Sequence, residues 1–208
     1  MEDVLDVYQR PFDPKRPQVC LDEGCKQLLS ECRQPLPLQA GQPKREDYEY
    51  VREGVCSFFL LFAPLLSWRH IEVTGQRTAK DFAHVIKDLV DVHFPNAEKI
   101  VLVMDNLNTH TPASLYEAFE PQEAKRLADK LEIHPTPRHG SWLNMAEIEL
   151  SVLGRQCLDR RIPDAQTLAR EIAAWEKARN DAKMTVHWHF TTEQARIKLS
   201  KLYPCLLP

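Results

Sequence analysis

The order of apolar and polar positions predicts a chain of short strands and amphipathic helices. Residues 1–10 place apolar side chains at helical spacing and stop at Pro11, which predicts a short N-terminal helix. The apolar run at 19–21 ends in two acids and predicts the first strand. The polar residues 24–46 are interrupted by prolines and are expected to form a long loop.

The middle of the chain predicts two paired strands, a helix and a buried strand. Residues 54–66 and 67–74 are rich in β-forming side chains and predict an antiparallel pair. Thr78 and Asp81 have the spacing of a capping box and predict the start of a helix. A run of five apolar residues then leads into Asp105, which is typical of a strand buried on both faces.

The last hundred residues predict mostly helices, with prolines or polar caps at their starts. Val186, Trp188 and Phe190 alternate with other residues as they would in a strand. The expected elements are helices at 112–119, 121–130 and 142–158, a strand at 131–134, a helix capped by Asp164 and a terminal helix capped by Thr191 with Gln194.

This order of elements predicts an α/β fold of the ribonuclease-H-like type. Three strands, a helix, a strand, helices, a strand and a helix follow one another, and an appendage of helix and strand comes last. The prediction is a mixed five-stranded sheet flanked by helices. Open sheets of this kind place their chemistry just past the carboxyl ends of parallel strands.

Composition narrows the class of protein. The chain has 208 residues and a net charge of −3, which disfavours a dedicated basic DNA-binding module but allows an enzyme that contacts DNA locally. No apolar run is long enough to span a bilayer, and no signal peptide is visible. The six cysteines form no C-x-x-C pair, which argues against a zinc site and for reduced thiols in a cytoplasmic protein.

Carboxylates follow the strands that this fold would bring together. The first and fourth strands lie side by side and parallel, so Asp22 and Asp105 would be neighbours. Oxygen ligands of this kind favour Mg²⁺ or Mn²⁺, and a site with two ions about 3.5–4 Å apart can cleave phosphodiesters. A third carboxylate would come from the helix at 142–158. Glu147 and Glu149 lie on opposite flanks of its apolar stripe, and periodicity leaves the choice open.

Two motifs resemble those of a known family. Asp105-Asn-Leu-Asn-Thr-His110 and His139-Gly-Ser-Trp-Leu-Asn-Met-Ala-Glu147 resemble the second and third catalytic motifs of DDE transposases. The resemblance is strongest to the bacterial IS-six-thirty family of insertion sequences, in the mariner superfamily. Val19-Cys-Leu-Asp22-Glu23 is similar to the first motif. Met145-Ala146 departs from the Pro-Ile of many relatives but keeps Glu147 in register.

The resemblance implies an activity and a set of site residues. Asp22, Asp105 and Glu147 would be the catalytic, metal-holding triad, with Mg²⁺ or Mn²⁺ as the cofactor and two ions in each site. The expected reaction is cleavage of DNA at terminal inverted repeats, followed by joining to TA-containing target DNA. A homodimer or higher assembly is implied as well.

The resemblance also implies a division of the chain. Relatives carry helix-turn-helix domains ahead of the catalytic domain, and none fits before Asp22. We therefore expect residues 1–16 to be a helix and linker from a missing upstream DNA-binding region, 17–160 the catalytic domain, and 161–208 an appendage packed on it. A separate helix-turn-helix half is a further expected partner.

Several other polar residues have both a functional and a structural interpretation. They would contact DNA or steady the metal ligands, but turn chemistry, helix capping or packing explains them as well. His187 and His189 share a face of the predicted 186–190 strand, where a half-exposed strand is favoured over a metal pair. Lys44, Arg45, Arg160 and Arg161 form small basic patches that would be solvated or would contact phosphates. The residues that would contact DNA or steady the metal ligands are Glu23, Asn106, Asn108, His110, His139, Trp142 and Asn144.

Two alternative functions remain open at this stage. The chain could be a truncated, catalytically silent transposase remnant that acts at most as an interaction module. It could also be a general ribonuclease-H-like nuclease that shares the metal chemistry but takes another substrate. The presence of all three acids favours the enzyme, and the two family motifs favour DNA transposition.

Overall fold

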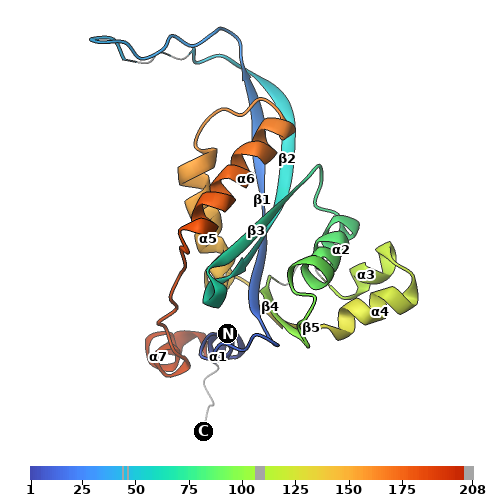
Figure 1. The fold of residues 1–208 in the computed structure, drawn as a ribbon. Helices are drawn as coiled ribbons and strands as arrows, with labels where there is room; N and C mark the ends of the chain where they lie inside the picture. The colour runs from blue at the N-terminus through green and yellow to red at the C-terminus, as the bar shows by residue number, and fades with distance from the viewer. Residues whose placement is uncertain (44, 46, 106–110, 204–208) are drawn as a thin grey trace.

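A mixed five-stranded sheet with strand order β3-β2-β1-β4-β5 forms the centre of the molecule (Figure 1). The computed structural model describes residues 1–43, 45, 47–105 and 111–203. β2 runs antiparallel to β1 and β3, whereas β4 runs parallel to β1 and β5. This is the predicted ribonuclease-H-like arrangement. The strands are β1 (Gln18–Glu31), β2 (Tyr50–Ala63), β3 (Trp68–Thr74), β4 (Ile100–Met104) and β5 (Leu131–Pro135).

Helices cover both faces of this sheet (Figure 1). α2, α3 and α4 lie on one face, α5 and α6 lie on the other, and α1 packs beside α7 at one end. Short 3₁₀ or π segments precede or extend several of them. The helices are α1 (Glu2–Tyr8), α2 (Ala79–Asp88), α3 (Ala113–Ala118), α4 (Pro121–Asp129), α5 (Met145–Leu153), α6 (Ala165–Asp181) and α7 (Thr192–Lys198), and the short segments are η1 (Pro64–Leu66), η2 (Leu89–His93), η3 (Ser141–Leu143), η4 (Gly154–Leu158) and η5 (Ser200–Leu202).

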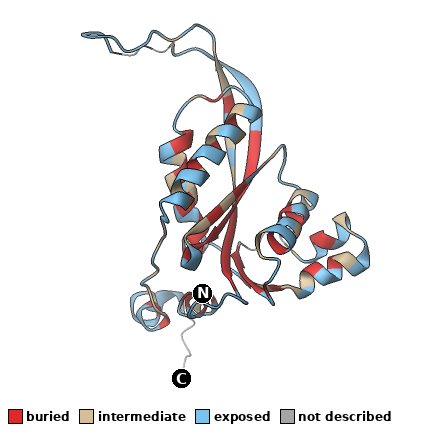
Figure 2. Ribbon diagram, in the orientation of Figure 1, coloured by how far each residue is buried: buried red, intermediate tan, exposed pale blue. Residues whose placement is uncertain are grey.

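The sheet separates two hydrophobic clusters, as a two-sided sheet requires. Alternation along β1 sends Val19 and Leu21 to the cluster under α2 and Cys20 to the cluster under α5. All five residues of β4 are buried, as predicted for a strand covered on both faces. Figure 2 shows this buried centre and the exposed outer half of the β1–β2 hairpin.

The prediction of a loop from residue 24 is wrong for its first part. β1 continues to Glu31, and residues 25–31 pair with β2 from Ser57 back to Tyr50. Most of this hairpin is exposed, so its side chains lack the apolar alternation that marks a half-buried strand (Figure 2). A register shift at Leu28/Leu29 falls opposite Gly54, whose φ of +103° glycine tolerates.

The predicted strand at 186–190 is also wrong, because no strand is assigned there. The alternation of its aromatic residues comes from packing against helices instead of from pairing with a sheet. The Trp188 ring lies 5.1 Å from the Tyr8 ring and 6.4 Å from the Trp142 ring. Residues 161–203 are therefore helix and extended chain.

The capped helices form as predicted. Thr78 with Asp81 and Thr191 with Gln194 both make complete capping boxes, and Asp164 accepts a hydrogen bond from the Thr167 N–H. The cysteines of the described ranges are free thiols. No helix in the described part of the chain is both long and apolar enough to cross a membrane.

Candidate active site

Two parallel strands bring Asp22 and Asp105 together. β1 and β4 pair in register up to Leu21 opposite Met104, and each aspartate is the next residue of its chain. One carboxylate oxygen each from Asp22, Glu23 and Asp105 lies within 4.8 Å of the others. The two aspartates expected at neighbouring strand positions are therefore neighbours, and Glu23 joins them.

Asp22 is held by hydrogen bonds from two elements. It is 7% exposed, and its Oδ1 accepts the Glu23 N–H at 2.8 Å. Asn144 Nδ2 lies 3.3 Å from Asp22 Oδ2 and donates to the Leu21 carbonyl at 2.8 Å. The Asn144 Oδ1 accepts the Ala146 N–H at 3.1 Å and thereby caps α5. Asn144 thus joins the β1 aspartate to the start of the helix that carries Glu147.

Electrostatics at Asp22 favour a bound cation. Burial, together with the negative charges of Glu147, Glu23 and Asp105, raises the pKa of Asp22 to about 7, although the hydrogen bond from the Glu23 N–H lowers it. A buried carboxylate among other carboxylates ionises readily only when a positive charge compensates it. Hard carboxylate oxygens are the donors that Mg²⁺ and Mn²⁺ prefer. The donor set therefore fits a divalent cation.

Glu147 and Glu149 have different environments, which the helix period alone did not resolve. Glu147 is exposed in the first turn of α5, and its charge acts on the Asp22 carboxyl. Glu149 is fully buried on the other side of the helix. Of the two acids, only Glu147 acts on the charge of Asp22, and its oxygens do not belong to the cluster formed by Asp22, Glu23 and Asp105.

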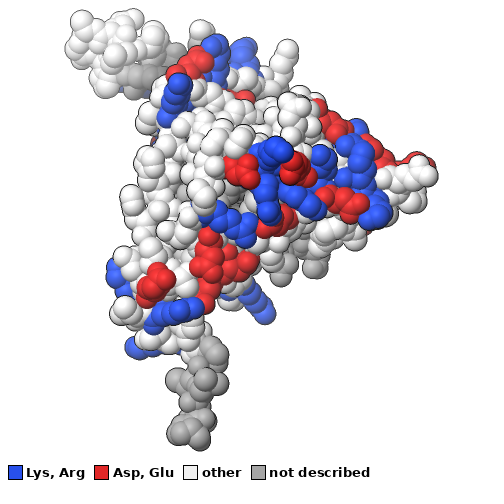
Figure 3. Space-filling view, turned by 60° about the horizontal axis from the view of Figure 1, so that its bottom comes forward, with Lys and Arg blue, Asp and Glu red and all other residues white. Residues whose placement is uncertain are grey.

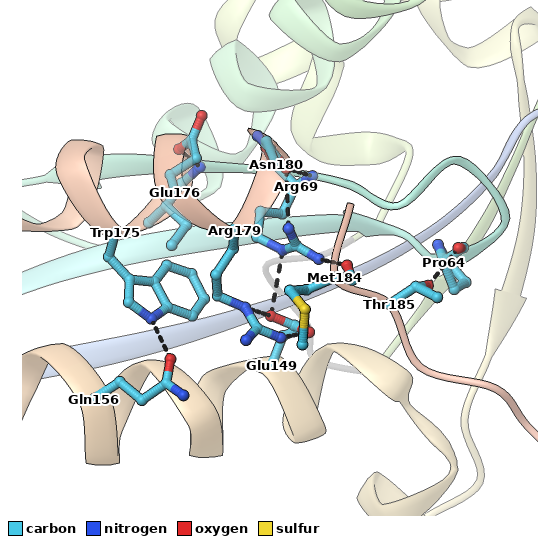
Figure 4. A network of polar contacts seen from close by, with 11 residues as sticks. Pro64, Arg69, Glu149, Gln156, Trp175, Glu176, Arg179, Asn180, Met184 and Thr185 are labelled. Carbon is cyan, nitrogen blue, oxygen red and sulfur yellow. Dashed lines mark hydrogen bonds and ion pairs between the residues drawn. The ribbon is translucent and has the colours of Figure 1, made fainter. Parts of the chain in front are cut away.

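Glu149 is the acid of a buried ion-pair network (Figure 4). Arg179 from α6 donates to both of its carboxylate oxygens, at 2.8 and 3.2 Å. The Nε of the fully buried Arg69 from β3 lies 3.3 Å from Glu149 Oε2. The Asn180 side-chain oxygen accepts hydrogen bonds from the Arg69 backbone N–H and guanidinium, and the Asn180 side-chain nitrogen donates to the Arg69 carbonyl. The Met184 carbonyl also accepts a hydrogen bond from the Arg69 guanidinium. The network ties α5 to β3 and α6.

Tyr8 supports the start of α5 from α1, a role that its place on an apolar stripe of the sequence did not predict. Its hydroxyl donates to the Leu143 carbonyl at 2.7 Å and accepts the Met145 N–H at 3.3 Å. These two residues flank Asn144. The N-terminal helix therefore fixes the chain that enters α5.

The remaining predicted site residues have varied surroundings. Glu23 lies 3.5 Å from Arg77, and His139 is exposed with a φ of +63°. Trp142 is 46% exposed and stacks on Trp188. Asn106, Asn108, His110 and Lys44 lie outside the described residues.

The structure also describes the surroundings of the expected histidine pair and of two arginines from the expected basic patches. The His187 and His189 rings are 6.5 Å apart. Arg160 pairs with Glu171 and Arg161 with Glu31, so carboxylates already compensate these two cations.

Comparisons with known proteins identify a matching family and several similar folds. The family model described as DDE superfamily endonuclease matches residues 17–169. The fold is similar to a pre-cleavage Mos1 transpososome, with a TM-score of 0.58, 15% identity, and coverage of 86% of this chain and 54% of that chain. It is similar to the Mos1 strand transfer complex, with a TM-score of 0.58, 16% identity and coverage of 84% and 51%.

A third similar structure is the mariner Mos1 paired-end complex with Mg, with a TM-score of 0.58, 16% identity and coverage of 86% and 52%. The chain thus spans about half the length of these solved chains. No curated protein sequence matches it.

Proposed function

The chain belongs to the DDE superfamily endonucleases, and we propose that it is the catalytic part of a metal-dependent DNA transposase. One observation carries this proposal: Asp22 and Asp105 converge at neighbouring strand positions, and the charge of Glu147 on α5 acts on Asp22. The proposed reaction is cleavage of a DNA strand and transfer of its 3′-hydroxyl to target DNA. A silent remnant has no need to keep these acids together.

The three carboxylates have distinct proposed roles. Asp22 and Asp105 would hold divalent cations between β1 and β4, and Glu147 would complete the ligand set from α5. Bound Mg²⁺ or Mn²⁺, with two ions expected, would activate the attacking oxygen and stabilise the leaving one. Asn144 orients Asp22 through its hydrogen bond and sets the start of α5 through its cap. Glu23 is a candidate additional ligand because it belongs to the same oxygen cluster.

The finer assignment rests on the sequence motifs. We infer membership of the IS-six-thirty branch, joining at TA dinucleotides, and a dimer or larger assembly on DNA from the resemblance at Asp105–His110 and His139–Glu147. The similar Mos1 structures are named as paired-end and strand transfer complexes, which is the kind of assembly proposed here. Recognition of the terminal repeats would require a helix-turn-helix region.

Strand transfer tests this function directly. DNA that carries the inverted repeats flanking the gene, pre-cut to a free 3′-hydroxyl, is incubated with plasmid, Mn²⁺ and the chain fused to a helix-turn-helix region that recognises the repeats. We expect joined products from the wild-type protein and a loss of at least about 100-fold in Asp105→Asn and Glu147→Gln, since each removes a metal ligand. Glu117→Gln, an exposed acid on α3, is the control. Unchanged joining in both site variants would exclude the triad, and cutting without joining would favour a general nuclease.

A further inference from the structure

A groove lies between β1 and α5, beyond the carboxylates along both elements. It has a volume of about 530 Å³ and is open to solvent. One wall is formed by β1 just after Asp22, and the other by α5 and the start of η4. The residues used in the argument below are Gly24, Lys26, Phe58, Ser151, Gly154 and Arg155.

Strand and helix periods place this groove in line with the catalytic acids. Asp22, Gly24 and Lys26 alternate along β1 on the face that α5 covers. Along α5, Ser151 and Arg155 follow Glu147 by one and two turns on the same side of the helix. The groove therefore lies next to the carboxylates along both elements, with its nearest lining residue on β1 at Gly24.

The floor of the groove is bare because two of its positions have no side chain. A Cβ at Gly24 would lie 2.5 Å from the Phe58 ring, so the β1 backbone rests directly on that ring. A Cβ at Gly154 would meet nothing within 4 Å, so this position borders open space. Backbone and aromatic carbon thus form a low, apolar floor on which an extended ligand can lie.

Two cations stand at the far end of the groove, and their hydrogen bonds go to neutral oxygens. Lys26 Nζ donates to the Leu158 carbonyl at 2.5 Å, and the exposed Arg155 donates to the Ser151 hydroxyl. Asp159 lines the groove as well, so two positive charges face one negative charge.

One cluster of surface cations differs from these two. Lys87 and Arg126, between α2 and α4, both pair with the carboxylates of Asp91 and Glu123. On the face shown in Figure 3, basic and acidic side chains lie side by side. Lys26 and Arg155 are therefore better placed than these paired cations to receive an anionic ligand.

The dimensions suit a nucleic acid strand. From Asp22 to Lys26 β1 rises about 13 Å, and from Glu147 to Arg155 the helix rises about 12 Å. Phosphates of one B-DNA strand are spaced about 3.4 Å along the axis, so this length corresponds to about three or four phosphates. Because the two rises are nearly equal, the strand wall and the helix wall extend about equally far from the acids.

We propose that this groove binds the phosphodiester backbone of the DNA strand that runs away from the reacting phosphate, with Lys26 and Arg155 on its phosphates. The inference rests on the proposed function and assigns a substrate subsite to it. Phosphate contacts of this kind fix the register of the strand without reading its sequence. The apolar floor over Phe58 lies beneath the sugars.

The salt dependence of DNA binding tests this subsite without catalysis. A fluorescent single-stranded oligonucleotide is titrated with the full chain in a chelating buffer at several salt concentrations. For Lys26→Gln and for Arg155→Gln, we expect the slope of log K against log salt to fall by about 0.7 each. Lys177→Gln, an exposed cation on α6 that pairs with Asp181, is the matched control and should keep the wild-type slope.

Cross-linking provides a second test that does not depend on removing charge. The test compares Ser151→Cys in the groove with Ser200→Cys in η5, and both positions are exposed. Both variants are made in a chain in which Cys25, Cys32 and Cys205 are replaced by serine. DNA with a thiol tethered to its backbone should form a disulfide at position 151 at least about tenfold faster than at position 200.

The outcomes separate this inference from the proposed function. Unchanged salt slopes in both groove variants, or equal cross-linking at the two positions, would overturn the groove while strand transfer by the wild type still supports the function. A wild-type chain that neither binds the oligonucleotide nor joins DNA would overturn both.

Discussion

Glu147 and Glu149 lie two residues apart on α5 and face opposite sides of that helix. Glu147 is exposed and its charge acts on the Asp22 carboxyl, whereas Glu149 is fully buried against Arg69 and Arg179. Two helical positions separated by about 200° cannot serve the same site. One acid is therefore available to a metal, and the other holds the helix in place.

This difference predicts that the two substitutions change stability by unequal amounts. Glu149→Gln removes the charge that compensates two arginines inside the protein, and we expect the free energy of unfolding to fall by about 3–5 kcal/mol. Glu147→Gln is expected to change it by less than about 0.5 kcal/mol in the absence of metal, because that side chain is exposed. Urea unfolding followed by circular dichroism measures both. Equal losses in the two variants would contradict the assignment.

The pKa of Asp22 predicts a pH dependence of stability. Burial and the neighbouring carboxylates raise this pKa to about 7, compared with about 3.9 in an unfolded chain. The folded state therefore holds this proton more tightly. Its stabilising contribution is complete below about pH 4 and is lost as the pH rises through about 7.

We accordingly expect Asp22→Asn to remove part of the decline in stability between about pH 4 and pH 8. One pKa unit corresponds to about 1.4 kcal/mol, so the effect is at most about 4 kcal/mol. Urea unfolding in a chelating buffer across this range gives the comparison. The same decline in wild type and variant would show that Asp22 does not titrate in this way.

Tyr8 predicts a link between α1 and the entry to α5. Tyr8→Phe leaves the Leu143 carbonyl and the Met145 N–H without their bonds to the hydroxyl, which should cost about 1–3 kcal/mol. Tyr116→Phe, at a half-exposed tyrosine of α3, is the matched control and should be nearly neutral. Thermal unfolding distinguishes them, and a neutral Tyr8→Phe would mean that this bond does not support the turn.

Much of the fold could be predicted because burial and capping leave clear patterns. β4 shows this best, since five consecutive apolar residues predict a strand covered on both faces. The sequence of the outer half of β1 has no comparable pattern of apolar residues. Residues 24–31 are held by backbone pairing with β2, and an exposed strand needs no apolar side chains.

The site was predictable in part for the same reason. Asp22 and Asp105 follow apolar runs, and strand order alone makes them neighbours. The residues around α5 depended on distant partners: Arg69 and Arg179 are far from Glu149 in sequence, and Tyr8 is far from Leu143. A helix period separates two flanks, but it cannot show which flank meets an arginine and which meets an aspartate.

Binding of Mn²⁺ to the purified chain tests the central claim most directly, because it requires neither DNA nor a further domain. Calorimetric titration should show binding to the wild type, and saturation at about 100 times Kd should raise the free energy of unfolding by about 2.7 kcal/mol. In Asp105→Asn, affinity should fall by about 10- to 100-fold, and Glu117→Gln should bind like the wild type. Equal Mn²⁺ affinity in the wild type and Asp105→Asn would contradict the account.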